Sequence, residues 1–177
     1  MRRWVWLVIL AFVAAWAQTT VGQALWLRTS LGWIGPDLLL AAAMLMALRS
    51  RRLVDAALTG WVFGLAMDLT VSGPGMGLLA MLYAGGGAGV FKVRGAFYHD
   101  RPSSQIVLVT LLGVFVYEGW TLYHVVFGTL GAAGAGRAML QALLVAVYTG
   151  LLAPVVGAML KPFQRWLVEN PTGRDRR

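Results

Sequence analysis

Cysteine is absent from the 177-residue sequence, and charged residues are scarce. The lack of cysteine excludes disulfide bonds and thiolate metal sites. Charged residues make up 12% of the chain, against about 25% in an ordinary soluble domain. Hydrophobic residues make up 59%, more than one soluble core of this size can hide. The composition therefore predicts an integral membrane protein, and it predicts one domain because no Pro/Ser-rich linker divides the chain.

Sequence motifs of catalysis are also missing. There is no His-x-x-x-His pair, no nucleophile elbow and no Walker-type phosphate loop, and the glycine-rich stretches lack a following Lys-Ser or Lys-Thr. The net charge of +8 would suggest nucleic acid in a soluble protein, but here the position of the cations matters more than their sum. We expect a non-catalytic protein with no cofactor, no metal and no nucleic-acid partner.

Long apolar segments predict about six transmembrane helices. A spanning helix needs roughly 20 apolar residues, because each residue rises 1.5 Å across a hydrocarbon core of about 30 Å. The predicted fold is an all-α compact bundle over residues 1–165, followed by a basic tail, 166–177, that we expect to be disordered. The predicted spans are 4–27, 31–48, 53–71, 75–91, 105–127 and 138–160.

Lysine and arginine predict the orientation, because these residues are retained on the cytoplasmic side of short loops. With six spans and a cytoplasmic N-terminus, 13 of the 15 cations fall on the inside. Only Arg28 and Arg137 fall in outer loops. We therefore expect both termini in the cytoplasm.

Acidic residues within or beside the predicted spans call for partners, since charge in a membrane is costly. Asp37 and Asp68 lie at the outer ends of the second and third spans. Because Arg28 and Arg137 are the outer cations, we expect an ion-pair network of these four residues.

Two polar residues lie deeper, within the fifth span. Glu118 could serve as a proton relay or a substrate contact, or it could be a neutral acid hydrogen-bonded to a neighbouring helix. The second alternative is the simpler one. His124 has no second ligand in sequence and is interpreted as a packed or interfacial histidine rather than a metal ligand.

Small residues recur every four positions in three of the spans. Such stripes let helix backbones approach closely, either within one chain or against a partner helix, and the first is the default. The stripes are Ala56-Gly60-Gly64-Asp68, Gly85-Gly89 and Ala11-Ala15.

Spans two to four carry motifs that resemble those of the MreD family, bacterial rod shape-determining membrane proteins. The family pattern is Pro-Asp before a leucine run, a Gly-Phe-x-x-Gly-Leu-x-x-Asp-like helix and a Ser-Gly-x-Pro-x-Gly turn. The chain departs from it in two places: Trp61-Val62 stand before Phe63, and Gly75 follows the turn's proline where leucine is frequent. The matching segments are Pro36-Asp37-Leu38-Leu39-Leu40, Gly60, Phe63-Gly64-Leu65, Asp68-Leu69, Ser72-Gly73-Pro74-Gly75 and Gly77.

The resemblance implies a scaffold in the cell-elongation machinery of the bacterial cytoplasmic membrane. It implies association with the bitopic protein MreC and, with RodA, a penicillin-binding transpeptidase and MreB filaments, a role in placing peptidoglycan synthesis. It also implies a bundle similar to that of vitamin-uptake S components. Asp68 would anchor a tight glycine turn beside a partner surface. The implied partner-binding or structural residues are Pro36, Asp37, Gly64, Asp68, Gly73, Pro74 and Gly77.

Two other functions stay open. The substrate-binding S component of an energy-coupling-factor vitamin transporter has a similar length and span number, and Ala11 and Ala15 match the spacing of its docking stripe. A vitamin site would need an outward-facing cavity with several polar side chains. A small proton-coupled carrier is the third possibility, and it depends on Glu118 alone.

Overall fold

The computed structural model describes residues 2–30, 32–71, 76–96, 101–127 and 131–167. These residues form six α-helices, a short 3₁₀ turn and one two-stranded antiparallel hairpin. The elements are α1 (Arg2–Ala24), β1 (Leu27–Thr29), β2 (Gly32–Ile34), α2 (Leu38–Leu48), α3 (Leu53–Thr70), α4 (Leu78–Val93), η1 (Arg94–Ala96), α5 (Pro102–Val126) and α6 (Ala132–Leu167).

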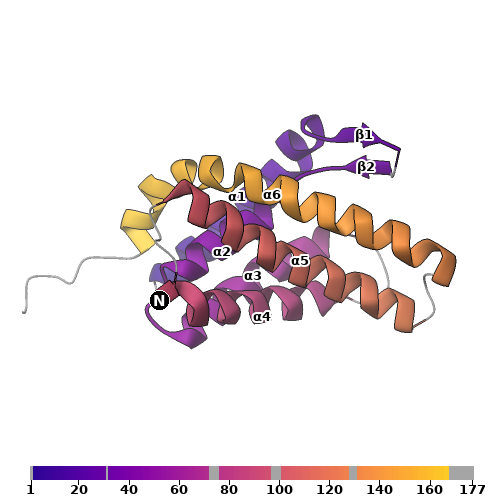
Figure 1. Ribbon diagram of the computed structural model, residues 1–177. Helices are drawn as coiled ribbons and strands as arrows, with labels where there is room; N and C mark the ends of the chain where they lie inside the picture. Colours follow the sequence, from indigo (N-terminus) through magenta and orange to yellow (C-terminus); the bar gives the residue numbers. More distant parts are fainter. Residues whose placement is uncertain (1, 31, 72–75, 97–100, 128–130, 168–177) are drawn as a thin grey trace, which may run out of the picture.

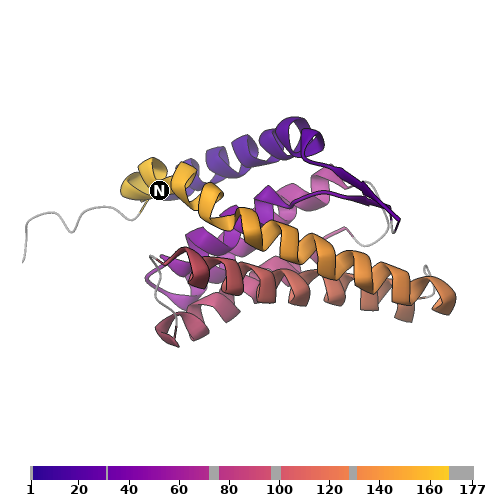
Figure 2. The same ribbon diagram turned by 45° about the horizontal axis from the view of Figure 1, so that its top comes forward.

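The helices run roughly along one axis, with α2 in the middle of the bundle (Figures 1 and 2). The start of α1 and the end of α6 lie at the same end, and the hairpin lies at the opposite end (Figure 1). At the first end, the guanidinium of Arg94 donates to the carbonyl of Ser50, which joins the end of α4 to the end of α2. At the other end, Arg137 donates to the carbonyl of Ser30 over 2.9 Å, which joins α6 to the hairpin.

In the described part of the chain, four helices are long and apolar enough to cross a membrane: Trp4–Ala24, Leu53–Thr70, Pro102–Val126 and Gly134–Lys161. They confirm that long apolar helices dominate the fold. The other two apolar helices, α2 with 11 residues and α4 with 16, are shorter than the spans predicted at 31–48 and 75–91. The last helix is longer than predicted, because the Gly/Ala-rich residues from Ala132 onward are helical.

The largest departure from the predicted elements is the segment before α2. Residues expected to begin a span form β2 and an extended turn instead. Gly32 has a φ of 124°, which side chains disfavour, and Pro36 has no backbone N–H to continue a helix. The helix therefore starts only after Asp37, and α2 is about 16 Å long at 1.5 Å per residue.

Enclosure by its neighbours explains how α2 can be so short. Ten of its 11 residues are buried, from Leu39 to Leu48. A helix surrounded by other helices does not need to match the bilayer thickness, because protein rather than lipid covers its ends. The run of leucine, alanine and methionine therefore forms the core of the bundle.

Glycines bring α3 and α4 into backbone contact. A Cβ atom on Gly64 would lie 2.6 Å from Cα of Ala80, and one on Gly60 would overlap the carbonyl of Tyr83. From the other helix, Gly87 meets the carbonyl of Ala56 in the same way. The stripe predicted in α3 thus packs within the chain.

The stripe predicted in α4, Gly85-Gly89, lies on the side of the helix that faces α5, and a different glycine contacts α3. Gly85 and Gly89 face Phe115 and Leu112 of α5 at ordinary distances of 3.7 and 3.5 Å for an added Cβ. Their neighbour Gly87 is the glycine that meets α3, since it lies one turn after Tyr83 on the same face of the helix.

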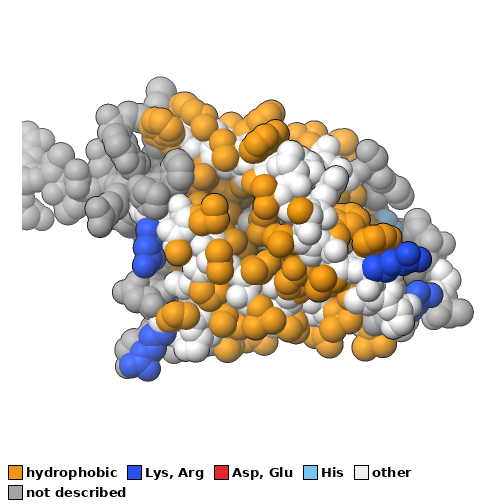
Figure 3. Space-filling model, turned by 90° about the horizontal axis from the view of Figure 1, so that it is seen from above, with side chains coloured by type: hydrophobic (Ala, Val, Ile, Leu, Met, Phe, Trp, Pro, Cys, Tyr) orange, Lys and Arg blue, Asp and Glu red, His pale blue; other side chains and the backbone are white. Residues whose placement is uncertain are grey.

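A broad apolar surface covers the middle of the molecule. In Figure 3 hydrophobic side chains fill the band between the two ends, and lysine or arginine side chains lie at both ends. Large apolar side chains point outward from α1, α5 and α6, among them Phe12, Leu122 and Met159, each more than half exposed. This distribution fits a membrane protein in which lipid surrounds the middle of the helix bundle.

Candidate functional site

Asp37 caps the first turn of the central helix. Its Oδ1 accepts the N–H of Leu40 over 2.8 Å, which satisfies one of the free donors at the start of α2. The residue is 2% exposed. A negative group at this end of a helix is also favoured by the helix dipole. The sequence Pro-Asp-Leu-Leu-Leu is therefore a helix start, with proline and aspartate before the first turn.

Two tyrosines from other helices converge on the second carboxyl oxygen of Asp37. The hydroxyl of Tyr117 in α5 donates to Oδ2 over 2.5 Å, and the hydroxyl of Tyr83 in α4 donates to the same atom. Tyr83 has no exposed surface. One buried carboxyl group thus accepts three hydrogen bonds from three segments of the chain.

The backbone around Asp37 is held from two further helices. The N–H of Asp37 donates to the hydroxyl of Thr149 in α6 over 2.9 Å. Gln18 in α1 bonds to both sides of the residue: it donates to the carbonyl of Pro36 over 3.0 Å and accepts the N–H of Leu38 over 2.8 Å. We call Gln18, Asp37, Tyr83, Tyr117 and Thr149 the Asp37 cluster, and it joins α1, α4, α5 and α6 to the start of α2.

Asp68 caps α4 from a distance. Gly77 precedes α4 with a φ of 95° and has no side chain with which to cap it. Asp68, at the end of α3, supplies the missing acceptor: its Oδ2 accepts the N–H groups of Gly77 and Ala80, each over 3.0 Å. Asp68 thus bonds to Gly77 and Ala80 beside the glycine-rich segment, whereas Gly73 and Pro74 lie outside the described residues.

The expected ion-pair network is wrong. Asp37 and Asp68 are bonded to backbone N–H and tyrosine hydroxyl groups, as given above. Arg28 instead lies over the ring of Trp33, 5.9 Å from its centroid, and Arg137 bonds to the hairpin backbone. Arg28 and Arg137 contact the hairpin, and the two acids hold the starts of α2 and α4.

Replacing Asp68 with alanine is expected to lower the free energy of unfolding by about 1–2 kcal/mol, because two N–H groups lose their acceptor. Asp68→Asn keeps an oxygen acceptor and should lose less than half as much. Thermal unfolding in detergent measures the loss, and hydrogen exchange should locate it at the amides of Gly77 and Ala80. Equal stability of Asp68→Ala and wild type would contradict the capping role.

Glu118 does not make the internal hydrogen bond that was expected of it. It lies on the partly exposed side of α5, and among the described parts of the chain no hydrogen bond or ion pair of Glu118 is present. Its neighbour Tyr117 points inward, and consecutive helix residues differ by about 100° in direction. His124 is buried, and the centroid of its ring lies 4.0 Å from that of Trp120.

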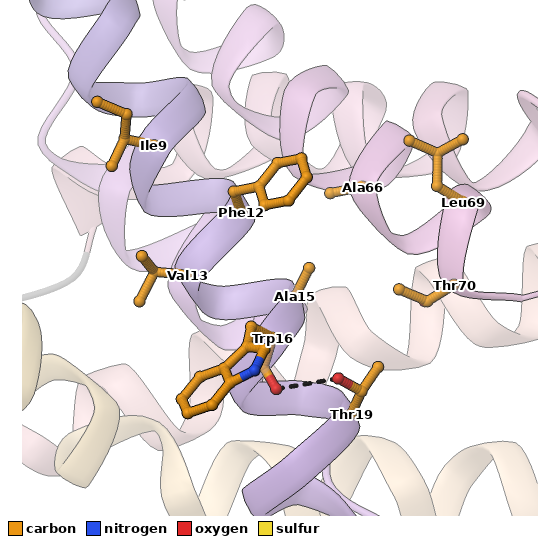
Figure 4. A pocket seen from close by; sticks show the side chains of 9 residues that line it. All are labelled: Ile9, Phe12, Val13, Ala15, Trp16, Thr19, Ala66, Leu69 and Thr70. Carbon is orange, nitrogen blue, oxygen red and sulfur yellow. Dashed lines mark hydrogen bonds between the residues drawn. The ribbon is translucent and has the colours of Figure 1, made fainter.

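Two cavities flank α1, and apolar side chains dominate both. One, of about 710 Å³, lies between α1 and α3 and is drawn in Figure 4. Its hydroxyl groups come from Thr19 and Thr70, and these already donate to the carbonyls of Trp16 and Met67. The other, of about 350 Å³, lies between α1, α2 and α6. Neither cavity offers the several free polar groups that a vitamin would need.

No group of three or more His, Asp or Glu residues that could hold a metal ion occurs in the described part of the chain. The polar groups of the Asp37 cluster are instead bonded to one another. The arrangement is thus suited to fixing helix positions.

Comparison with known proteins adds no relative. No protein-family model, no curated protein and no solved structure matches the chain.

Four members of the Asp37 cluster were missed by sequence reasoning: Gln18, Tyr83, Tyr117 and Thr149. The available signal was the occurrence of uncharged polar residues inside long apolar runs, which in a membrane also need hydrogen-bond partners. The sequence reasoning applied that rule to charged residues only.

Proposed function

We propose that this chain is a non-catalytic scaffold of the bacterial cell-elongation complex, similar to MreD. In this proposal it lies in the cytoplasmic membrane with both termini inside, binds an MreC-like bitopic protein and helps to position peptidoglycan synthesis. RodA, a penicillin-binding transpeptidase and MreB belong to the same proposed assembly. The distribution of lysine and arginine supports the orientation.

The proposal is supported mainly by the structural roles of the residues in the shared motif. The residues behind the resemblance that lie in the described chain include Asp37, Gly64, Asp68 and Gly77. Asp37 and Asp68 cap helices, Gly64 lets two helices touch, and Gly77 starts α4. All four fix the shape of the bundle, which fits a family whose shared motif serves a structural purpose.

The S-component alternative is less well supported. Its docking stripe would need Ala11 and Ala15 on an accessible face, but Ala11 is 3% exposed and packs in the core. The cavities beside α1 are apolar, as described above. We therefore prefer the scaffold.

Co-purification tests the proposed function. The tagged full chain is produced with the MreC-like protein encoded in the same genome, and we expect the two to co-purify from detergent-solubilised membranes. Depletion of the chain in a rod-shaped host should give round cells. Purification without that partner, normal cell shape after depletion, or retention of a vitamin by the purified chain would contradict the scaffold.

Asp68→Ala extends the test to a named residue. We expect it to reduce the recovered partner at least threefold, because the start of α4 loses its cap, while Asp68→Asn should recover most of it. The amount of each variant in the membrane is measured in parallel, so that lost binding is separated from lost protein.

A further inference from the structure

Glu118 is the one acid in the middle of an otherwise apolar, outward-facing stripe of α5. The flanking residues follow helical spacing, and their exposed fractions run from 47% to 68%. A carboxyl group in this position faces lipid wherever α5 crosses a membrane. The stripe consists of Val107, Leu111, Phe115, Glu118, Leu122 and Val126.

The depth of Glu118 keeps it away from water. α5 has 25 residues and exceeds the bilayer core in length, at about 37 Å against roughly 30 Å. Glu118 lies eight residues before Val126, or about 12 Å from that end at 1.5 Å per residue. The side chain is too short to reach the interface from there, so a hydrogen-bond partner within the membrane is the remaining way to satisfy it.

The chain itself offers no such partner in its described residues. The polar groups nearest in sequence, Tyr117 and Thr121, point to the interior, where Tyr117 is bonded to Asp37. Glu118 is therefore unlike Asp37 and Asp68, whose carboxyl groups accept hydrogen bonds from donors within the chain.

We propose that a second copy of this chain covers the stripe and pairs with it through Glu118. Two copies that are inserted in the same orientation and pair through the same face are related by a two-fold axis along the membrane normal, so residue 118 meets residue 118 at the same depth. A protonated carboxyl group is both donor and acceptor and is therefore complementary to itself. A foreign helix would need a donor at the matching depth, whereas a second copy supplies one by symmetry.

The proposal depends on α5 crossing the membrane and is independent of the cell-elongation role. Co-purification with an MreC-like protein can therefore fail while the pairing of two copies is retained, and the reverse also holds.

Disulfide cross-linking in native membranes tests the pairing, and the absence of cysteine from the sequence makes single substitutions specific. Leu111→Cys and Leu122→Cys, one or two turns from Glu118, should give disulfide-linked dimers on mild oxidation. Leu151→Cys is the matched control: it is similarly exposed, at 57%, but lies on α6. It should give at least about fivefold less dimer.

Glu118 variants then test the hydrogen bond. In the Leu122→Cys background, Glu118→Leu should lower dimer yield at least about fivefold, in line with the strength of hydrogen bonds between membrane helices. Glu118→Gln keeps a donor and an acceptor and should retain most of the dimer. Since Glu118 has no hydrogen bond within the described part of the chain, the thermal stability of both variants should match that of the parent in dilute detergent, where the copies are separated.

Three results would overturn the proposal. One is equal cross-linking from Leu151→Cys and Leu122→Cys, which would indicate random collision. Another is a dimer yield that Glu118→Leu leaves unchanged or that Glu118→Gln lowers as far as Glu118→Leu does. The third is cross-linking of the stripe to a different protein in place of the dimer, which would assign it to a heterologous helix.

Discussion

Replacing Asp37 with alanine is expected to cost roughly 4 kcal/mol of unfolding free energy. The loss of the helix cap accounts for about 1 kcal/mol, and two buried tyrosine hydroxyls left without an acceptor add about 1–3 kcal/mol each. Chemical unfolding in detergent micelles measures the loss. The cost should be among the largest of any single polar substitution, because one carboxyl group serves α2, α4 and α5 together.

An isosteric pair of substitutions provides the control. Asp37→Asn and Glu118→Gln both replace a carboxyl group with an amide, but of the two only Asp37 has hydrogen-bond partners among the described residues. We expect Asp37→Asn to cost about 1–2 kcal/mol, since the amide still caps the helix but cannot accept from both tyrosines as well, and Glu118→Gln to stay within about 0.5 kcal/mol of wild type.

Coupling between the partners gives a sharper test than any single loss. Tyr83→Phe alone should cost about 1 kcal/mol. Added to Asp37→Ala, it should cost nothing or restore stability, because it removes a hydroxyl that no longer has an acceptor. Purely additive losses would show that the carboxyl group and the hydroxyl do not interact.

The sequence predicted a helix correctly wherever the apolar segment and the helix in the structure have about the same length. That holds for α1, α3, α5 and α6, which face the outside and are long enough to cross a bilayer. It fails for α2, because an apolar run of 31–48 looks the same whether it spans a bilayer or fills a protein core. A shorter helix was indicated by the helix-breaking residues Gly32, Gly35 and Pro36. The prediction gave more weight to the apolar residues around them.

The partners of the acids could not be predicted by matching charge to charge. Asp37 and Asp68 were paired with Arg28 and Arg137 because these are the cations that the sequence predicts on the outer side. The donors that bind Asp37 are instead hydroxyl groups 46 and 80 positions away in sequence, and a local N–H. No pattern in one sequence states which distant hydroxyl reaches a carboxyl group, since that depends on how α2, α4 and α5 pack together.

Helix phase decided the remaining differences. Tyr117 and Glu118 are adjacent, yet one points to the core and the other to the outside. Gly85 and Gly87 are two residues apart, and only Gly87 meets α3. The four-residue spacing predicted the packing stripe of α3 correctly. Spacing alone does not show which side of a helix faces the core, because that depends on where the neighbouring helices lie.

Gly64→Ala is expected to lower the unfolding free energy by about 2 kcal/mol, and Gly64→Val by more than 3 kcal/mol or to the point of abolishing the folded yield. An added Cβ would lie 2.6 Å from Cα of Ala80 and 2.7 Å from the carbonyl oxygen of Leu79. Both are backbone atoms of α4, so no side chain can rotate away and the two helices must separate. Thermal unfolding of purified variants in detergent measures the effect.

Gly85→Ala is the matched control, because it adds the same methyl group to a helical glycine. There the added Cβ would lie at an ordinary distance of 3.7 Å from a ring atom of Phe115. It should leave the unfolding free energy unchanged or raise it by up to about 1 kcal/mol, since alanine has a higher helix propensity than glycine. Gly87→Ala, which meets the carbonyl of Ala56 from the opposite helix, should resemble Gly64→Ala. If all three substitutions had the same effect, the loss at Gly64 could not come from contact between α3 and α4. A loss confined to Gly64 and Gly87 would mean that the distance between these two helices is set by backbone contact, as the geometry requires.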